Sequence, residues 1–146
     1  GITGVQVHAP YQGSLEAELD LTGRVREEVG SDIEVWRAVS MSAGDGGVIA
    51  EGLHASVDKL ALDAHAGGSG ETFDWADIPE AVKPRALLAG GLTPDNLEGA
   101  LRVGCAGLDL NSGVEYPECA GRKDAGALRR AFDIIGNYHY PRTNNE

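Results

Sequence analysis

The stretch KLALDAHAGGSGETFDW, residues 59–75, decides the fold of this chain. Side chains alternate along a strand, so Leu60 and Leu62 share one face and Asp63 lies on the other. The apolar run ends in this carboxylate, and a glycine-rich loop follows it. In a chain of alternating strands and helices, an acid at the carboxyl tip of a strand stands where a (β/α) barrel keeps its catalytic groups. An ordinary solvated turn aspartate is the alternative at this point.

The length and composition describe one domain without a membrane span. The 146 residues are 42% hydrophobic, which is enough to bury a core. No run approaches the ~18 apolar residues of a membrane span, and no segment has the pattern of a signal peptide. Cys105 and Cys119 form neither a disulfide framework nor a zinc motif, and the four histidines show no metal spacing. We therefore expect a cytoplasmic protein without a metal.

The charge balance limits the partners of this chain. Its formal net charge is −11, from 23 acidic and 12 basic residues. A chain of this kind does not bind nucleic acid through a basic face. The acids are spread over the expected helices, as a solvated coat would be, and such surfaces suit a salty cytosol. We expect a salt-adapted protein that binds a small molecule, with no nucleic-acid or membrane partner.

Strands and helices alternate along the whole chain. The pattern predicts strands at 4–8, 34–40, 59–63, 85–90 and 107–112. It predicts helices at 15–29 after a Ser14 cap, weakly near 48–55, between Asp74 and Pro84, from Thr93 and Pro94 to about 103, and at 124–135 with Leu128, Ala131, Phe132 and Ile135 buried. This alternation is typical of βαβ units around a parallel sheet. We expect one partial (β/α) barrel domain over residues 1–136 and a polar tail over 137–146.

Two glycine turns follow the last two expected strands. Gly90 and Gly91 end one strand, and Asn111, Ser112 and Gly113 end the next. Backbone N–H groups in such turns can take a phosphate, and barrels form phosphate sites from the loops after their last two strands. Glycine also serves tight turns generally. Two such turns in succession favour the phosphate site.

Other polar residues leave more than one interpretation open. His8, at the tip of the first strand, is either a site residue or a packed or surface histidine. Arg37, between apolar neighbours in its strand, is a barrel-interior or substrate-anion residue, or else one half of a structural ion pair. The glycines at 67, 68 and 70 lack the lysine of a phosphate-cradling P-loop, and we interpret them as a mobile lid.

Several stretches together resemble one family, phosphoribosylanthranilate isomerase of tryptophan biosynthesis. They are VQVHA (5–9), LALDAHAGGSGETFDW (60–75), LLAGGLTPDN (87–96), LDLNSGVE (108–115) and GRKD (121–124). Their order and spacing match the family, and the run of three glycine-rich motifs is highly specific. The resemblance covers nearly the whole chain, but only strands four to eight of the family's barrel.

The resemblance implies a TIM-barrel type fold, here an incomplete barrel that lacks about the first three strands. It implies the Amadori rearrangement of N-(5′-phosphoribosyl)anthranilate to 1-(2-carboxyphenylamino)-1-deoxyribulose 5-phosphate, without a cofactor. Asp63 matches the general acid, which protonates the ribose ring oxygen. Gly90, Gly91, Ser112 and Gly113 match the phosphate-holding turns, and His8, Arg37 and Asp109 fall on inward strand positions that line the pocket.

The chain also departs from the family. The general base, a cysteine at the tip of the family's first strand, has no counterpart, and neither has the second-strand arginine that holds the anthranilate carboxylate. We therefore expect an N-terminal portion to be missing, an isolated chain without useful activity, and self-association through open sheet edges. Two alternatives are another phosphosugar barrel, such as the histidine-pathway isomerase, and a non-catalytic phosphate-binding half-barrel that assembles with a separate chain.

Overall fold

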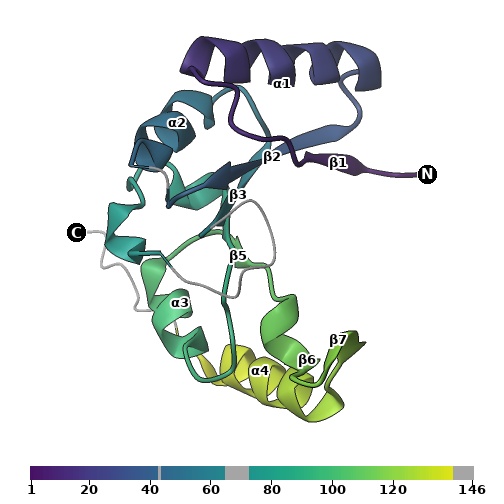
Figure 1. Cartoon of the computed structure of the whole chain (residues 1–146), viewed down its shortest axis with the longest axis vertical. Coiled ribbons are helices and arrows are strands. Elements are labelled where there is room, and N and C mark those ends of the chain that lie inside the picture. The colour runs from purple at the N-terminus through teal and green to yellow at the C-terminus, as the bar shows by residue number, and fades with distance from the viewer. Residues whose placement is uncertain (43, 65–72, 140–146) are drawn as a thin grey trace.

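Five parallel strands form one open sheet. The computed structural model describes residues 1–42, 44–64 and 73–139. The strands lie in the order β1 (Gly4–Val7), β2 (Glu34–Ser40), β3 (Lys59–Asp63), β4 (Ala86–Leu88) and β5 (Gly107–Leu108). The helices α1 (Leu15–Val29), α2 (Gly46–Leu53), α3 (Leu97–Val103) and α4 (Ala125–Asn137) follow one another in an arc around this sheet (Figure 1). The described sheet does not close, and β1 and β5 are its edges, as the sequence predicted.

Helix α1 begins and ends where its capping residues predict. The Ser14 hydroxyl accepts a hydrogen bond from the Ala17 N–H at 3.2 Å, which satisfies a donor of the first turn. Gly30 follows the helix with a φ of 79°, and its N–H donates to the Arg26 carbonyl at 2.9 Å. A left-handed residue at this position closes the last turn, and glycine adopts it without steric cost.

The core lies between the sheet and the helices. Leu60 and Leu62 of β3 are fully buried and pack with residues of α2 such as Leu53. Asp63 ends the strand on the opposite face, as the alternation predicted. A smaller cluster joins α3, α4 and the segment after β5 through Leu97, Val114, Ala127 and Ala131. Two packed layers therefore fix the carboxyl ends of the strands.

The two strands that lead into the phosphate turns are both shorter than predicted. The strand expected at 107–112 covers only Gly107–Leu108, because the chain turns at Asn111 into a short 3-10 helix, η3 (Ser112–Val114). The strand expected at 85–90 likewise covers Ala86–Leu88. The turns rather than the strands thus carry the predicted site residues at this edge.

The helix expected from Thr93 begins instead at Leu97. Asn96 occupies the N-cap position, and its side-chain oxygen accepts a hydrogen bond from the Thr93 N–H at 2.9 Å. Pro94 therefore lies in the turn that precedes the helix. Because the asparagine closes this turn on itself, the residues before Leu97 do not adopt helical hydrogen bonding.

Two further segments differ from the prediction. The single helix expected between Asp74 and Pro84 is a pair of 3-10 turns, η1 (Trp75–Asp77) and η2 (Lys83–Arg85), and Pro84 lies inside the second. After η3, an antiparallel hairpin of β6 (Glu115–Tyr116) and β7 (Cys119–Lys123) stands where the sequence indicated only a loop. The predicted lid at 67–70 lies outside the described residues.

Helix α4 buries a narrower face than predicted. Ala127 and Ala131 are buried, whereas Phe132 is 68% exposed. The helix packs against α3 and η3 on one side only, and β5 is the last strand of the described sheet, so no described strand covers the Phe132 side. None of the described helices is both long and apolar enough to span a membrane.

Candidate active site

A cavity of about 160 Å³ lies at the carboxyl ends of the strands. Every predicted site residue except Arg37 lines it: His8, Asp63, Gly90, Gly91, Asp109, Ser112 and Gly113. These residues follow or end β1, β3, β4 and β5. Parallel strands bring their carboxyl ends to one edge of a sheet, which is why residues more than 100 positions apart meet here.

The register of the sheet decides which side chains face this cavity. Ser40 of β2 pairs with Asp63 of β3, so both lie on the same face. Val7 of β1 pairs with Arg37 of β2, so the next residue, His8, faces with Ala38 toward the cavity side. The side chains of paired residues in neighbouring strands point the same way, and Arg37 therefore points to the opposite face.

Gly90 brings the backbone of the first phosphate turn directly against Asp63. Its φ is 81°, which favours glycine, and a Cβ at this position would lie 2.3 Å from Asp63 Oδ1 and 2.8 Å from the Ala64 nitrogen. Both constraints require a residue without a side chain. Because Gly90 has no side chain, the turn can lie in contact with the Asp63 carboxylate.

The two phosphate turns also touch each other. A Cβ on Gly113 would lie 1.9 Å from the Leu92 carbonyl oxygen, so the second turn rests on the backbone of the first. The Asn96 side-chain amide donates to the Gly91 carbonyl at 2.8 Å and holds the first turn in place. Within the described parts of the chain, the N–H groups of Gly90 and Gly91 have no backbone acceptor. Both turns thus present backbone to one cavity.

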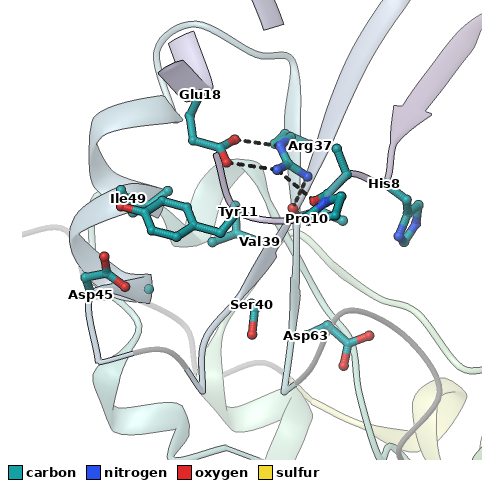
Figure 2. A pocket seen from close by; sticks show the side chains of 13 residues that line it. His8, Pro10, Tyr11, Glu18, Arg37, Val39, Ser40, Asp45, Ile49 and Asp63 are labelled. Atoms are coloured by element: carbon teal, nitrogen blue, oxygen red, sulfur yellow. Dashed lines mark hydrogen bonds and ion pairs between the residues drawn. The ribbon is translucent and has the colours of Figure 1, made fainter. Parts of the chain in front are cut away.

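Arg37 lines an adjoining cavity of about 210 Å³, but from the helix-facing side of β2 rather than from the inward strand position expected. Its side chain is 3% exposed and forms a two-pronged ion pair with Glu18 of α1: Nε to Oε2 at 2.8 Å and Nη2 to Oε1 at 3.1 Å (Figure 2). Its remaining donors reach the carbonyls of Val7, Ala9 and Ala38 at 2.7–3.2 Å. A guanidinium has five N–H donors, and all five are used here. Of the two possibilities left open by the sequence, the structural ion pair is the observed arrangement.

Arg37 nevertheless positions a cavity residue. The carbonyls of Val7 and Ala9, which flank His8 in the sequence, both accept hydrogen bonds from it. Glu18 completes this support, because its Oε1 accepts the Gln12 N–H at 2.9 Å in the same loop. The buried pair therefore fixes the loop that carries His8.

A second cavity, of about 210 Å³, adjoins the first and shares His8 and Asp63 with it. It opens toward α2, and Tyr11 and Asp45 line it from two loops (Figure 2). Partial desolvation, and then a hydrogen bond with Asp45, raises the pKa of Tyr11. The sequence analysis missed both residues, since neither belongs to a motif or ends a strand.

Neither cysteine is placed as a base for this site. Burial raises the pKa of Cys105 to about 11, and Cys119 lies exposed on the β6–β7 hairpin. A thiol with such a pKa is protonated near neutral pH. No group of three or more metal-ligating side chains is assembled within residues 1–42, 44–64 and 73–139.

Replacing Gly90 with alanine is expected to cost more stability than its backbone conformation alone requires. A left-handed conformation costs a non-glycine residue about 1–2 kcal/mol, and the new methyl group would also displace the Asp63 carboxylate. The free energy of unfolding should be measured in urea for this variant.

Gly104→Ala is the matched control, because Gly104 has a φ of 82° and open space around its Cβ position. This variant measures the cost of a side chain at a positive φ without a collision between the new methyl group and another residue. Equal losses in the two variants would contradict the close approach of Gly90 to Asp63.

Comparison with known proteins identifies the family. The model of the family described as N-(5′phosphoribosyl)anthranilate (PRA) isomerase matches residues 4–133. The chain belongs to the PRA isomerase family. This confirms the resemblance inferred from the motifs and the α/β architecture of TIM-barrel type.

Solved structures and a close relative agree with this assignment. The chain is 59% identical over 144 residues to the tryptophan biosynthesis protein TrpCF of Corynebacterium glutamicum, covering 96% of this chain and 30% of the relative. The phosphoribosyl anthranilate isomerase structure from Thermus thermophilus aligns with a TM-score of 0.67 and 31% identity, over 92% of this chain and 60% of that one. The structure from Thermococcus kodakaraensis gives 0.61 and 31%, over 93% and 64%.

The chain therefore spans under a third of its TrpCF relative and under two thirds of these PRA isomerase structures. In TrpCF the matching segment is part of a longer chain. The family is established for the 4–133 segment, and the residues that line the cavity come from the motifs on which the family resemblance rested.

Proposed function

We propose that this chain supplies the general acid and the phosphate site of a PRA isomerase. The observation that carries the proposal is the single cavity that unites Asp63 with both glycine turns. The substrate would be N-(5′-phosphoribosyl)anthranilate, and the product 1-(2-carboxyphenylamino)-1-deoxyribulose 5-phosphate, a step of tryptophan biosynthesis. No cofactor is required for this rearrangement.

The two turns are suited to hold the phosphate. Gly90 and Gly91 present N–H groups without a described backbone acceptor, and Ser112 and Gly113 lie against them through the Leu92 contact. These dipoles act at contact distance, whereas the distant carboxylates of an acidic protein are screened beyond ~8 Å at physiological salt. The net charge of −11 is therefore compatible with binding an anion here, since Asp63 and Asp109 are the only acids among the described residues that line the cavity.

Asp63 is suited to act on the ribose that follows the phosphate. Its carboxyl group stands beside the Gly90 turn and between the two adjoining cavities. As general acid it would protonate the ring oxygen and open the furanose. Ring opening leaves a C1′=N Schiff base, and a base must then remove the proton from C2′, so that the electron pair forms the C1′=C2′ bond of an enolamine. The enolamine becomes the ketone when C1′ gains a proton and the C2′ hydroxyl loses one.

The family's cysteine base has no counterpart among the cavity residues described here. Cys105 and Cys119 lie away from the cavity lining, and among the described residues His8 is the only histidine that lines the cavity. We propose that further strand–helix units of the family complete the site along the open edges β1 and β5. Without them, binding of phosphate and proton donation remain, but turnover does not.

Inorganic phosphate is expected to raise the melting temperature of the chain, and Gly91→Asp is expected to abolish this protection. The φ of Gly91 is 61°, and the new carboxylate would repel the anion at contact distance. The measurement is the melting temperature across a phosphate series at constant ionic strength.

Gly30→Asp is the control, since Gly30 has a φ of 79° at the end of α1 and open space around it. It adds the same charge at another glycine of positive φ, away from the cavity, and should leave the protection unchanged. Full protection of the Gly91 variant would place the phosphate elsewhere and remove the main support for the proposal.

A further inference from the structure

The β6–β7 hairpin has no part in the proposed chemistry, yet its last residue, Lys123, donates hydrogen bonds to Asn111 at the start of the second phosphate turn. Lys123 Nζ lies 2.9 Å from the Asn111 carbonyl oxygen and 2.5 Å from Asn111 Oδ1. It also lies 2.7 Å from Glu115 Oε1. Asn111 immediately precedes Ser112 and Gly113, which line the cavity.

The three contacts of Lys123 account for all its donors. An ammonium group carries three N–H bonds, and each has an acceptor here. The side chain is therefore committed to the turn and makes its contribution through the backbone. It is a positioning group and not a ligand of the phosphate.

Glu115 holds Lys123 in this position. Its side chain is 12% exposed, and its second oxygen accepts the N–H of Gly121 in β7 at 2.8 Å. The hydrogen bond from Lys123, followed by that from Gly121, lowers the pKa of Glu115. The Glu115 carboxylate thus remains charged and links β6 to Gly121 and Lys123 of β7.

The turn needs such support because the sheet does not extend to it. Strand β5 ends at Leu108, and the Asp109 N–H to the Leu88 carbonyl, at 2.9 Å, is the last backbone bond to β4 in this segment. The Asn111 carbonyl then accepts only a 3.3 Å contact from the Val114 N–H besides Lys123. Gly113 and Val114 are held by packing against Leu92 and the α3–α4 cluster, so loss of the ammonium would free the Asn111 end of the turn.

We propose that Lys123, oriented by Glu115, is a positioning residue that aligns the Asn111–Gly113 turn for phosphate binding. The inference rests on the proposed phosphate site. It assigns to the β6–β7 hairpin the task of organising the ligand-binding backbone from outside the cavity. A preorganised turn binds more tightly because less conformational freedom is lost on binding.

The competing explanation is that Lys123 favours phosphate binding only through the attraction between its positive charge and the anion. Its neighbour Arg122 distinguishes this explanation from the positioning role. Arg122 stands on the same strand and carries the same charge, but its guanidinium lies over the Tyr116 ring at 5.2 Å from the centroid. Arg122→Met and Lys123→Met therefore remove equal charge from adjacent positions. Only the second removes contacts to the turn.

The test titrates inorganic phosphate into the full 146-residue chain and follows the amide signals of Ser112 and Gly113 by NMR. Lys123→Met is expected to weaken phosphate binding about tenfold, since the free energy of one hydrogen bond to a charged group corresponds to a change in affinity of about tenfold. Arg122→Met should change it less than about threefold. Lys123→Arg keeps the charge, but a planar fork cannot meet three acceptors around one nitrogen, so its binding should stay weakened.

Hydrogen exchange of the same amides without phosphate gives a second readout that does not depend on the ligand. Exchange at Ser112 and Gly113 should become at least about tenfold faster in Lys123→Met than in Arg122→Met. If Lys123→Met does not fold, Glu115→Gln, which keeps the side-chain volume, replaces it with the same expectation. Unchanged exchange, or full rescue by Lys123→Arg, overturns the positioning role. Failure of the unsubstituted chain to bind phosphate instead overturns the proposed phosphate site, and exchange still decides the role of Lys123.

Discussion

Replacing Glu18 with alanine is expected to destabilise the chain by about 3–5 kcal/mol. Glu18 and Arg37 are 1% and 3% exposed, and the alanine variant would leave the guanidinium charge buried without its counter-charge. The Gln12 N–H would lose its acceptor as well. A loss of this size is a large part of the 5–15 kcal/mol that holds an ordinary domain together. Urea unfolding followed by circular dichroism measures it.

The control is Glu16→Ala, two residues away on the exposed side of α1. It removes the same charge and gives the helix the same residue, so its effect should stay within about 0.5 kcal/mol. Similar losses in both variants would mean that water reaches Arg37 when Glu18 is removed. Lost order at His8, visible as a changed histidine NMR signal in Glu18→Ala only, would link the pair to the cavity.

Much of the fold follows from local sequence. The Ser14 cap and the Gly30 stop predicted both ends of α1, and the alternation in residues 59–63 predicted the buried Leu60 and Leu62 face. These features depend on neighbours within a few residues, which a sequence displays directly. The parallel order of five strands followed from their spacing alone.

The direction of Arg37 did not follow, because it depends on an element far along the chain. Alternation gives two faces to a strand but does not say which face meets the helices. Glu18, 19 residues earlier, lies on the buried side of α1, and only the packed structure brings the two charges together. Glu18 stands in the first turn of α1, beside the exposed Glu16, and the acidic composition gave no sign that one of these acids is buried.

The hairpin and the Phe132 face were missed for a similar reason. Residues 119–123 are three small residues followed by two basic ones and show no period of two, since β7 is exposed along its length. Its partner β6 is two residues long and pairs irregularly. Phe132 fits a helical apolar stripe, but what covers such a stripe is decided by neighbouring elements. The site motifs, by contrast, stood at strand ends, where parallel topology alone brings them together.

Asp63→Asn is expected to lower isomerase turnover by about 10²–10⁴-fold in an enzyme completed with the remaining strand–helix units of the family. The amide keeps the shape of the carboxyl group beside Gly90, but it cannot donate a proton to the ring oxygen. Phosphate affinity should change by less than about threefold, because the turns are unaltered. The assay is the loss of anthranilate-type fluorescence as the substrate is consumed.

Asp95→Asn is the control for the change of charge, since Asp95 lies exposed in the turn before α3 and outside both cavity linings. Its turnover should remain within about threefold of the completed enzyme. The 146-residue chain alone should bind phosphate without turnover, because the described cavity holds no counterpart of the family's cysteine base, and the reaction requires a second proton-transfer group within hydrogen-bond reach of C2′. Strong activity of that chain would assign the base to a residue of its own, and His8 would be the first to replace. Turnover that survives in Asp63→Asn would instead leave the chain as a phosphate-binding scaffold whose acid lies in the added units.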